Sequence, residues 1–377
     1  MTRPTVLAYY FPNWHRDPRN EQWFGPGWTE WELVRGATAR FPGHRQPRIP
    51  ALGYRDEADP AVAAAEISLA ADHGVDGFLF DYYWYADGSY LSGALDDGFL
   101  RAENTERLRF ALMWANHQLV DIFPSHGTPA AQLMDAALDR EAFERFVRHV
   151  IDNYFSRPNY LTVDDKPWFT LYDIGNFVEG LGGLEAARDA LDWFRDQTRQ
   201  AGYPGLHLDA VVWSATVITT GTETPPDLPE VVRRLGFDSG SSYVWLHHHD
   251  ASQAPFPNGS NAELRESAFT DYDRYADQLD VDFYPNVSVG WDPSPRTDQS
   301  LPYRGTGYPW TSVWDQSPAE FAVGLQRAID YLTKQRPRHS IITVNAWNEW
   351  TEGSYLLPDT THGLAYLEAI RAVFGVA

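Results

Sequence analysis

The chain has 377 residues with 52 acidic and 30 basic side chains, which give a formal net charge of −22. Such an acidic chain repels phosphate backbones and anionic membranes, so we expect neither nucleic acid nor a membrane as partner. Cysteine is absent, which excludes disulfides, thiolate zinc sites and a cysteine nucleophile. The first residues lack a signal-peptide pattern, and no apolar run reaches the roughly 18 residues that span a bilayer. The expected location is therefore the cytoplasm.

Aromatic residues make up 15% of the chain, with 15 Trp and 20 Tyr. Sugars present flat C–H faces that stack on aromatic rings, and their hydroxyl groups need polar partners. This composition is consistent with a carbohydrate site and an oligo- or polysaccharide as the partner. A large core filled with aromatic side chains is the alternative explanation.

Eight short apolar or aromatic runs alternate along the chain with longer helical or loop segments. The runs cover residues 5–11, 75–82, 108–114, 167–172, 208–213, 237–245, 284–291 and 341–350. Helices are predicted at 60–73, where Gly74 supplies the C-terminal cap, and at 141–154, 184–201, 319–334 and 364–374.

Strands that alternate with helices indicate parallel strands joined by crossover helices. Eight repeats predict an α/β fold with a single (β/α)₈ TIM-type barrel and long βα loops, in one catalytic domain that covers residues 1–377. An open doubly wound sheet is the alternative. A dinucleotide-binding version of it is disfavoured, because no Gly-x-Gly-x-x-Gly follows the first strand.

Nearly every predicted strand ends in aromatic and polar residues. Barrel enzymes carry their active sites at the carboxyl ends of the strands, so these endings predict a site there. The candidate substrate-binding residues at these ends and in the loops are Tyr10, Trp28, Glu30, Trp31, Asp81, Tyr83, Trp84, Trp114, Asn116, His117, Tyr172, Trp245, Trp291, Asp292, Arg296, Asn348, Trp350 and Tyr355. Arg296 either binds an anionic substituent or orients Asp292, and we favour orientation.

Two carboxylates, Glu349 and Glu352, follow the last predicted strand at a spacing of three residues. Glycosidic cleavage needs such a pair, with one group to protonate the leaving oxygen and one to act as base or nucleophile. Trp347 and Trp350 beside them could exclude water and raise one pKa, and Gly353 would permit a tight turn. The alternative is that both Glu are exposed at a helix N-terminus. The aromatic surroundings favour a catalytic pair.

At this motif the chain resembles the glycoside hydrolase family 99-like group, also called WbsX-type. The matching segments are Ala8-Tyr9-Tyr10-Phe11-Pro12-Asn13-Trp14-His15, Gly25-Pro26-Gly27-Trp28-Thr29-Glu30-Trp31, Gly74-Val75-Asp76-Gly77-Phe78, Tyr83-Trp84-Tyr85, Trp114-Ala115-Asn116, Gly290-Trp291-Asp292 with Pro295-Arg296, and Asn348 to Tyr355. They span nearly the whole chain.

The resemblance implies a retaining glycosidase without an enzyme nucleophile. Glu349 would deprotonate the 2-hydroxyl of the sugar, which attacks the anomeric carbon and gives a 1,2-anhydro intermediate. Glu352 would serve as acid and then as base. This chemistry requires a 2-hydroxyl opposite the leaving group, as in α-mannose and α-rhamnose. One departure is His117-Gln118-Leu119, where many relatives have Glu-Asn-Trp, so the sugar can differ.

No metal and no cofactor are expected. The run His247-His248-His249-Asp250 looks like a metal cluster, but consecutive residues in an extended segment point in alternating directions. Two alternatives to the hydrolase stay open: a glycosyltransferase of surface-polysaccharide biosynthesis and a carbohydrate-binding protein without catalysis. A transferase commonly uses an Asp-x-Asp motif with a metal, and Asp271-Tyr272-Asp273 is the nearest match in the chain.

Overall fold

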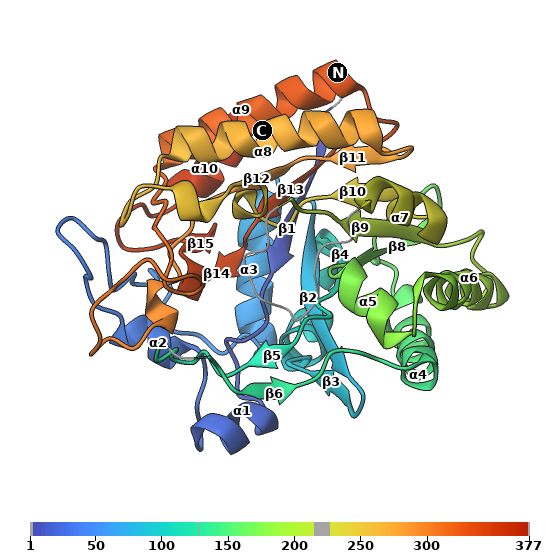
Figure 1. Ribbon diagram of the computed structural model, residues 1–377, viewed down its shortest axis with the longest axis horizontal. Helices are drawn as coiled ribbons and strands as arrows, with labels where there is room; N and C mark the ends of the chain where they lie inside the picture. The colour runs from blue at the N-terminus through green and yellow to red at the C-terminus, as the bar shows by residue number, and fades with distance from the viewer. Residues whose placement is uncertain (1–2, 128, 215–226, 376–377) are drawn as a thin grey trace.

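The computed structural model describes residues 3–127, 129–214 and 227–375. Its centre is a parallel barrel (Figure 1). The barrel strands in chain order are β1 (Thr5–Tyr10), β2 (Gly77–Tyr85), β4 (Arg109–Trp114), β8 (Lys166–Leu171), β9 (His207–Val211), β10 (Ser239–Ser241), β11 (Asp282–Tyr284), β12 (Asn286–Ser288) and β13 (Ile341–Asn345).

The barrel closes through a strand that is split into two parts. β11 pairs with β10, and β12 pairs with β13. Only Pro285 separates the two parts, and its carbonyl oxygen accepts a hydrogen bond from the Thr343 amide at 3.0 Å. Together β11 and β12 therefore act as the seventh strand, and β13 pairs back to β1. The predicted (β/α)₈ barrel is confirmed.

Helices surround the barrel. They are α3 (Pro60–Asp72), α4 (Arg140–Val150), α5 (Ile174–Gly180), α6 (Leu184–Gln200), α7 (Leu228–Leu235), α8 (Asn261–Gln278), α9 (Pro318–Gln335) and α10 (Ala365–Phe374). Their ends follow local chemistry: Asp59 caps α3 by accepting from the Ala61 amide, and Ser317 and Glu320 form a capping box at α9. Gly74 has φ +89° just after α3, as the predicted helix end requires.

The predicted sixth and eighth strands were too long. The sixth ends at Ser241, and residues Trp245–His248 form a short 3₁₀ helix. The eighth ends at Asn345. The chain then forms an antiparallel hairpin of β14 (Asn348–Glu349) and β15 (Ser354–Tyr355) around a 3₁₀ turn, Trp350–Glu352. Both errors arise because apolar residues continue beyond the strand and pack in the loop.

The segments that follow β1, β2 and β4 gather at one end of the barrel (Figure 1). They include α1 (Pro18–Phe24), α2 (Trp31–Gly36), β3 (Gly88–Tyr90) and the hairpin of β5 (Leu119–Val120) with β6 (Gln132–Met134). The remaining strand, β7 (Thr162–Val163), pairs with β8 at the start of that strand. Within the three described ranges, no helix combines the length and hydropathy of a membrane span.

Candidate active site

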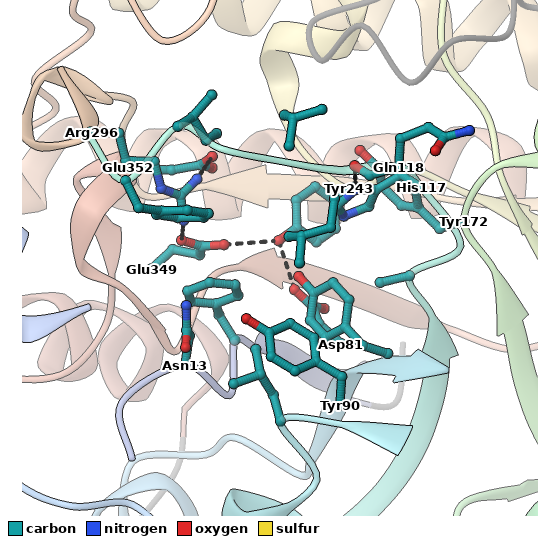
Figure 2. A pocket seen from close by; sticks show the side chains of 18 of the residues that line it. Asn13, Asp81, Tyr90, His117, Gln118, Tyr172, Tyr243, Arg296, Glu349 and Glu352 are labelled. Carbon is teal, nitrogen blue, oxygen red and sulfur yellow. Dashed lines mark hydrogen bonds and ion pairs between the residues drawn. The ribbon is translucent and has the colours of Figure 1, made fainter. Parts of the chain in front are cut away.

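A pocket opens among the loops at the carboxyl ends of the strands (Figure 2). Its polar lining consists of Asn13, Asp81, His117, Gln118, Arg296, Glu349 and Glu352. Its aromatic lining consists of Phe11, Tyr83, Tyr90, Phe123, Tyr172, Tyr243 and Tyr308. A concave site lined by aromatic rings and a few converging polar groups is the usual form of a small-ligand pocket.

Arg296 is the electrostatic centre of the pocket. Its Nη1 lies 2.5 Å from Glu352 Oε1, its Nη2 lies 3.4 Å from Glu349 Oε2, and its Nε lies 2.8 Å from Glu30 Oε1. All four residues are buried. One guanidinium thus faces three carboxyl groups, and it both orients them and stabilises their charged forms.

A second contact holds Glu352. The Tyr308 hydroxyl donates to Glu352 Oε1 at 2.9 Å, and it also accepts from Arg296 Nη1. Burial raises the pKa of Glu352, while the Arg296 charge and the Tyr308 hydrogen bond oppose that shift.

The Tyr243 hydroxyl links Glu349 to a further carboxyl group (Figure 2). It lies 2.9 Å from Asp81 Oδ2 and 3.4 Å from Glu349 Oε1. A phenol has a single proton, so it can donate fully to only one of these carboxyl groups at a time. The other oxygen of Asp81 is buried without a protein partner.

The pocket holds more carboxyl groups than cations and therefore retains protons. Burial and then the Glu352 charge raise the pKa of Glu349 well above its ordinary value. Burial also raises the pKa of Asp81, against the hydrogen bond from Tyr243. Because Arg296 and Tyr308 lie closer to Glu352 than to Glu349, the proton favours Glu349 and the charge favours Glu352.

The hairpin β14–β15 carries the two glutamates into the pocket. Asn348 anchors it to the end of β1, since its Oδ1 accepts from the Phe11 amide and its Nδ2 donates to the Phe11 carbonyl, both at 2.8 Å. Gly353 follows Glu352 with φ +65°, and a Cβ there would lie 2.7 Å from the Cβ of Asp292. Only glycine fits this turn.

Comparisons with known proteins agree with this architecture. A family model described as "Glycosyltransferase WbsX" matches residues 6–370. The chain belongs to the WbsX family. A curated relative, the uncharacterized protein WxcX of Xanthomonas campestris pv. campestris (strain B100), is 30% identical over 383 residues, which are 97% of this chain and 49% of the relative. The chain therefore spans about half the length of the curated relatives it matches.

Solved structures with similar folds include a glycoside hydrolase and a glycoside hydrolase-like protein. The family 99 endo-α-mannosidase of Bacteroides thetaiotaomicron has a TM-score of 0.56 at 16% identity, over 100% of this chain and 97% of that one. A glycoside hydrolase-like protein reaches a TM-score of 0.63 at 14% identity, with 100% and 95% covered. At these identities the similarity establishes the barrel fold and leaves the activity open.

The pocket of this WbsX-family chain brings together several of the predicted site residues. They are Asp81, Tyr83, His117, Tyr172, Arg296, Glu349 and Glu352. Burial lowers the pKa of His117, so its imidazole is neutral. Arg296 binds the glutamates and has no bond to Asp292, so the predicted orientation of Asp292 by Arg296 is wrong.

Strand alternation places three other predicted residues on the outside of the barrel. Asp81 and Tyr83 point into the pocket, so the neighbouring Trp84 points outward and packs on His149 at 4.7 Å. Trp114 packs outward on Phe146 of α4 at 4.9 Å. Tyr10 points toward Glu66 of α3, with its hydroxyl 3.4 Å from a carboxyl oxygen.

Three predicted tryptophans and a tyrosine belong to the packing behind the pocket. Trp350 stacks on Tyr355 at 3.8 Å and lies 5.9 Å from Trp31. Tyr355 donates to Asp359. Trp245 lies against Gly324 of α9. Burial of these large rings stabilises the core, so the rings do not face a ligand.

Five further predicted residues support the pocket without lining it. Glu30 binds Arg296, and Asn348 fixes the hairpin. Trp28 packs on Phe24 and Phe123, and Trp291 donates to Thr311 beneath Tyr308. Asn116 joins the end of β4 to the start of α5 by accepting from the Asp173 amide at 2.7 Å and donating to the Asp173 carbonyl.

Asp292 also lies behind the pocket, where it fixes the segment that contains His44 and Gln46. Its carboxylate contacts His44 and Gln46 at 2.9 and 2.8 Å. Burial would raise its pKa, but the hydrogen bond from His44 and the charge of Arg48 hold it below the ordinary value.

Sequence reasoning did not select Tyr243, Tyr308, Phe11, Asn13 or Tyr90, which all line the pocket. Tyr243 lies near the end of the predicted sixth strand, where the sequence analysis names Trp245 as the candidate. No tryptophan is among the described residues of the lining. Tyr308 lies in a loop where no strand period applies, so the sequence offers no signal for it.

The three consecutive histidines have separate partners. His247 approaches the Tyr172 hydroxyl, His248 bonds to Ser242 and Asp271, and His249 contacts Ser267. Among the residues that the structure describes, no group of three His, Asp or Glu side chains has a metal-binding arrangement.

Proposed function

We propose that the chain is a retaining glycoside hydrolase that cleaves α-linked glycans with Glu349 and Glu352. The observation that carries this proposal is the pair of buried carboxyl groups that share Arg296 in one pocket. Glycosidic cleavage needs one protonated and one ionised carboxyl group beside the scissile bond, and the charge balance of the pocket provides that state.

The reaction runs in two balanced steps. Glu349 takes the proton of the sugar 2-hydroxyl while the 2-oxygen bonds to the anomeric carbon, the bond to the leaving oxygen breaks, and Glu352 protonates that oxygen. A 1,2-anhydro sugar results. Water then attacks the anomeric carbon and gives its proton to Glu352, while the ring-opened 2-oxygen recovers the proton from Glu349. Two inversions give net retention, and the 2-hydroxyl must lie opposite the leaving group, as in α-mannosides and α-rhamnosides.

The proposed roles require the proton on Glu352 when substrate is bound. The contacts of the pocket favour the proton on Glu349, so substrate binding must reverse the order. A sugar hydroxyl that donates to Glu349 stabilises its charged form, and loss of that proton frees Glu352 to become protonated, because the two groups titrate together.

The family description favours a glycosyltransferase as the second candidate. The match to its Asp-x-Asp motif, Asp271-Tyr272-Asp273, is poorly placed to bind a metal and a sugar nucleotide, because both carboxylates have protein partners. Asp271 and Asp273 lie on α8, where Asp271 bonds to His248 and Arg274. Asp273 pairs with Lys334 at 2.8 Å.

The decisive experiment measures hydrolysis of α-mannosides, α-rhamnosides and bacterial surface polysaccharides, with NMR detection of the first anomer released. Glu349→Gln and Glu352→Gln should each lower kcat by about 10²–10⁴-fold, whereas Glu103→Gln, an exposed carboxyl on the surface, should be silent. Glycosyl fluorides need little acid assistance, so they should restore turnover in Glu352→Gln but not in Glu349→Gln. Sugar transfer from a nucleotide donor without hydrolysis of any glycoside would refute the proposal in favour of the transferase.

A further inference from the structure

A second pocket adjoins the candidate active site. It is lined by Ser214 and by residues from two segments, 246–256 and 305–312. It has about 870 Å³ of space for water-sized molecules, compared with about 70 Å³ in the first pocket. None of the paired carboxyl groups described above lines it.

Tyr308 is the wall between the two pockets, because it lines both of them. Its hydroxyl donates to Glu352 on the first side. A group that Glu352 protonates therefore lies next to Tyr308, the residue that the two pockets share.

The lining of the second pocket combines hydroxyl groups, one carboxylate and an exposed aromatic ring. Ser252, Thr306 and Ser312 supply hydroxyls, and hydrogen bonds from Ser252 lower the pKa of the Asp250 carboxyl, which keeps it ionised. Phe256 is 44% exposed, although a ring of this size is usually buried. No Lys or Arg is among the described lining residues. This mixture suits a neutral, hydroxyl-rich ligand with apolar faces.

The two lining segments are bonded to each other, so the pocket has a fixed shape. Ser312 donates through its hydroxyl to the Pro255 carbonyl at 3.0 Å, and the Val313 amide donates to the Pro257 carbonyl at 2.8 Å. Phe256 stacks on Tyr303 at 5.5 Å, which holds its ring in place.

We propose that the second pocket binds the sugar residues on the leaving-group side of a glycan chain. The chain would pass over Tyr308, with the scissile bond beside Glu352 and one or more further residues against Phe256 and Asp250. The substrate is then an oligo- or polysaccharide cleaved between residues. This proposal rests on the proposed function, because that function assigns the leaving oxygen to Glu352.

The test compares substrates with and without sugars on the leaving-group side. The probes are linear α-linked mannose and rhamnose oligosaccharides of two to six residues and the matching glycosyl fluorides, whose leaving group cannot reach the second pocket. Phe256→Ala and Asp250→Asn should each lower kcat/KM for oligosaccharides about tenfold, the effect of losing one aromatic or charged contact. Both variants should hydrolyse the fluorides at the wild-type rate. Leu364→Ala, which truncates an exposed apolar side chain elsewhere, is the matched control and should alter neither substrate.

Equal kcat/KM losses on both substrate types, or no loss on either, would overturn the second pocket while leaving the hydrolase standing. Absence of hydrolysis from every substrate would instead count against the proposed function. In that case saturation-transfer NMR measures whether the same oligosaccharides bind to the second pocket. Loss of the signal in Phe256→Ala would support the pocket, and equal signals in variant and wild type would exclude it.

Discussion

Replacement of Arg296 by methionine should destabilise the fold in a pH-dependent way. The methionine keeps much of the side-chain volume but removes the charge that faces Glu30, Glu349 and Glu352. Loss of one partner from a buried ion pair costs about 3–5 kcal/mol, because the remaining charge has no compensation. We expect a loss of that size in the free energy of unfolding at pH 7.

The sign of the pH dependence follows from the raised pKa values of Glu349 and Glu352. A carboxyl group with a raised folded-state pKa contributes stability below its unfolded pKa and loses it as pH rises through the folded pKa. Removal of Arg296 raises both folded values further. The variant should therefore lose stability more steeply than wild type above about pH 4.5, the ordinary value for Glu. At pH 5 protonation relieves much of the penalty.

Urea unfolding at pH 5 and pH 7 measures the effect. The control is Arg40→Met, because Arg40 is half-buried and bonds to Thr297 and the Asp298 carbonyl but to no carboxylate of the pocket. Its loss should be about 1 kcal/mol at both pH values. A destabilisation of Arg296→Met that is equal at both pH values, or no larger than that of the control, would refute the charge argument.

Three further changes test the surroundings of the pair. Tyr243→Phe removes a hydrogen bond that lowers the pKa of Asp81, so the Asp81 carboxyl should titrate at a higher pH in the variant than in wild type, as followed by carboxyl-carbon NMR; an unchanged titration would contradict the link. Glu66 has a pKa of about 7, raised by burial from 4.5, and its contribution to stability is lost as pH rises through that range. Urea titrations of Glu66→Gln should show a smaller decline in stability between those values than wild type. Asn348→Ala leaves the Phe11 amide and carbonyl unpaired, so it should cost about 2–3 kcal/mol and lower kcat more than it changes KM; a normal kcat would show that the hairpin needs no anchor.

The fold was predictable because its signal repeats. Barrel strands such as β1, β2 and β4 are short apolar or aromatic runs, and each is followed by a segment long enough for a crossover. Strand ends were harder to place, as residues 237–245 show. Only Ser239–Ser241 are paired, because Trp245 lies in a 3₁₀ helix and packs on the outer helices. Hydrophobicity reports burial, and it does not say whether the buried residue lies in a strand.

The site was predictable where side-chain chemistry and strand period agree. Asp81 and Tyr83 share one face of β2, and the same period assigns Trp84 to the other face. Tryptophan content is a poor guide to the pocket lining, since Trp114, Trp245 and similar rings are fully buried in the core. Contacts such as that of Tyr308 with Glu352 join residues 44 positions apart and follow from the fold alone.

The charge balance of the pocket finally bears on which glycan chemistry it can perform. Arg296 is the only Lys or Arg among the described lining residues, and three carboxyl groups already engage it. A nucleotide sugar would add a diphosphate to a site whose carboxyl groups retain protons for lack of positive charge, and its binding would have to overcome that repulsion. A neutral glycan brings only hydroxyl groups, which can donate to Asp81 and Glu349 and relieve their buried charge. The same electrostatics that prepares one proton for transfer therefore favours glycan hydrolysis over transfer from a nucleotide donor.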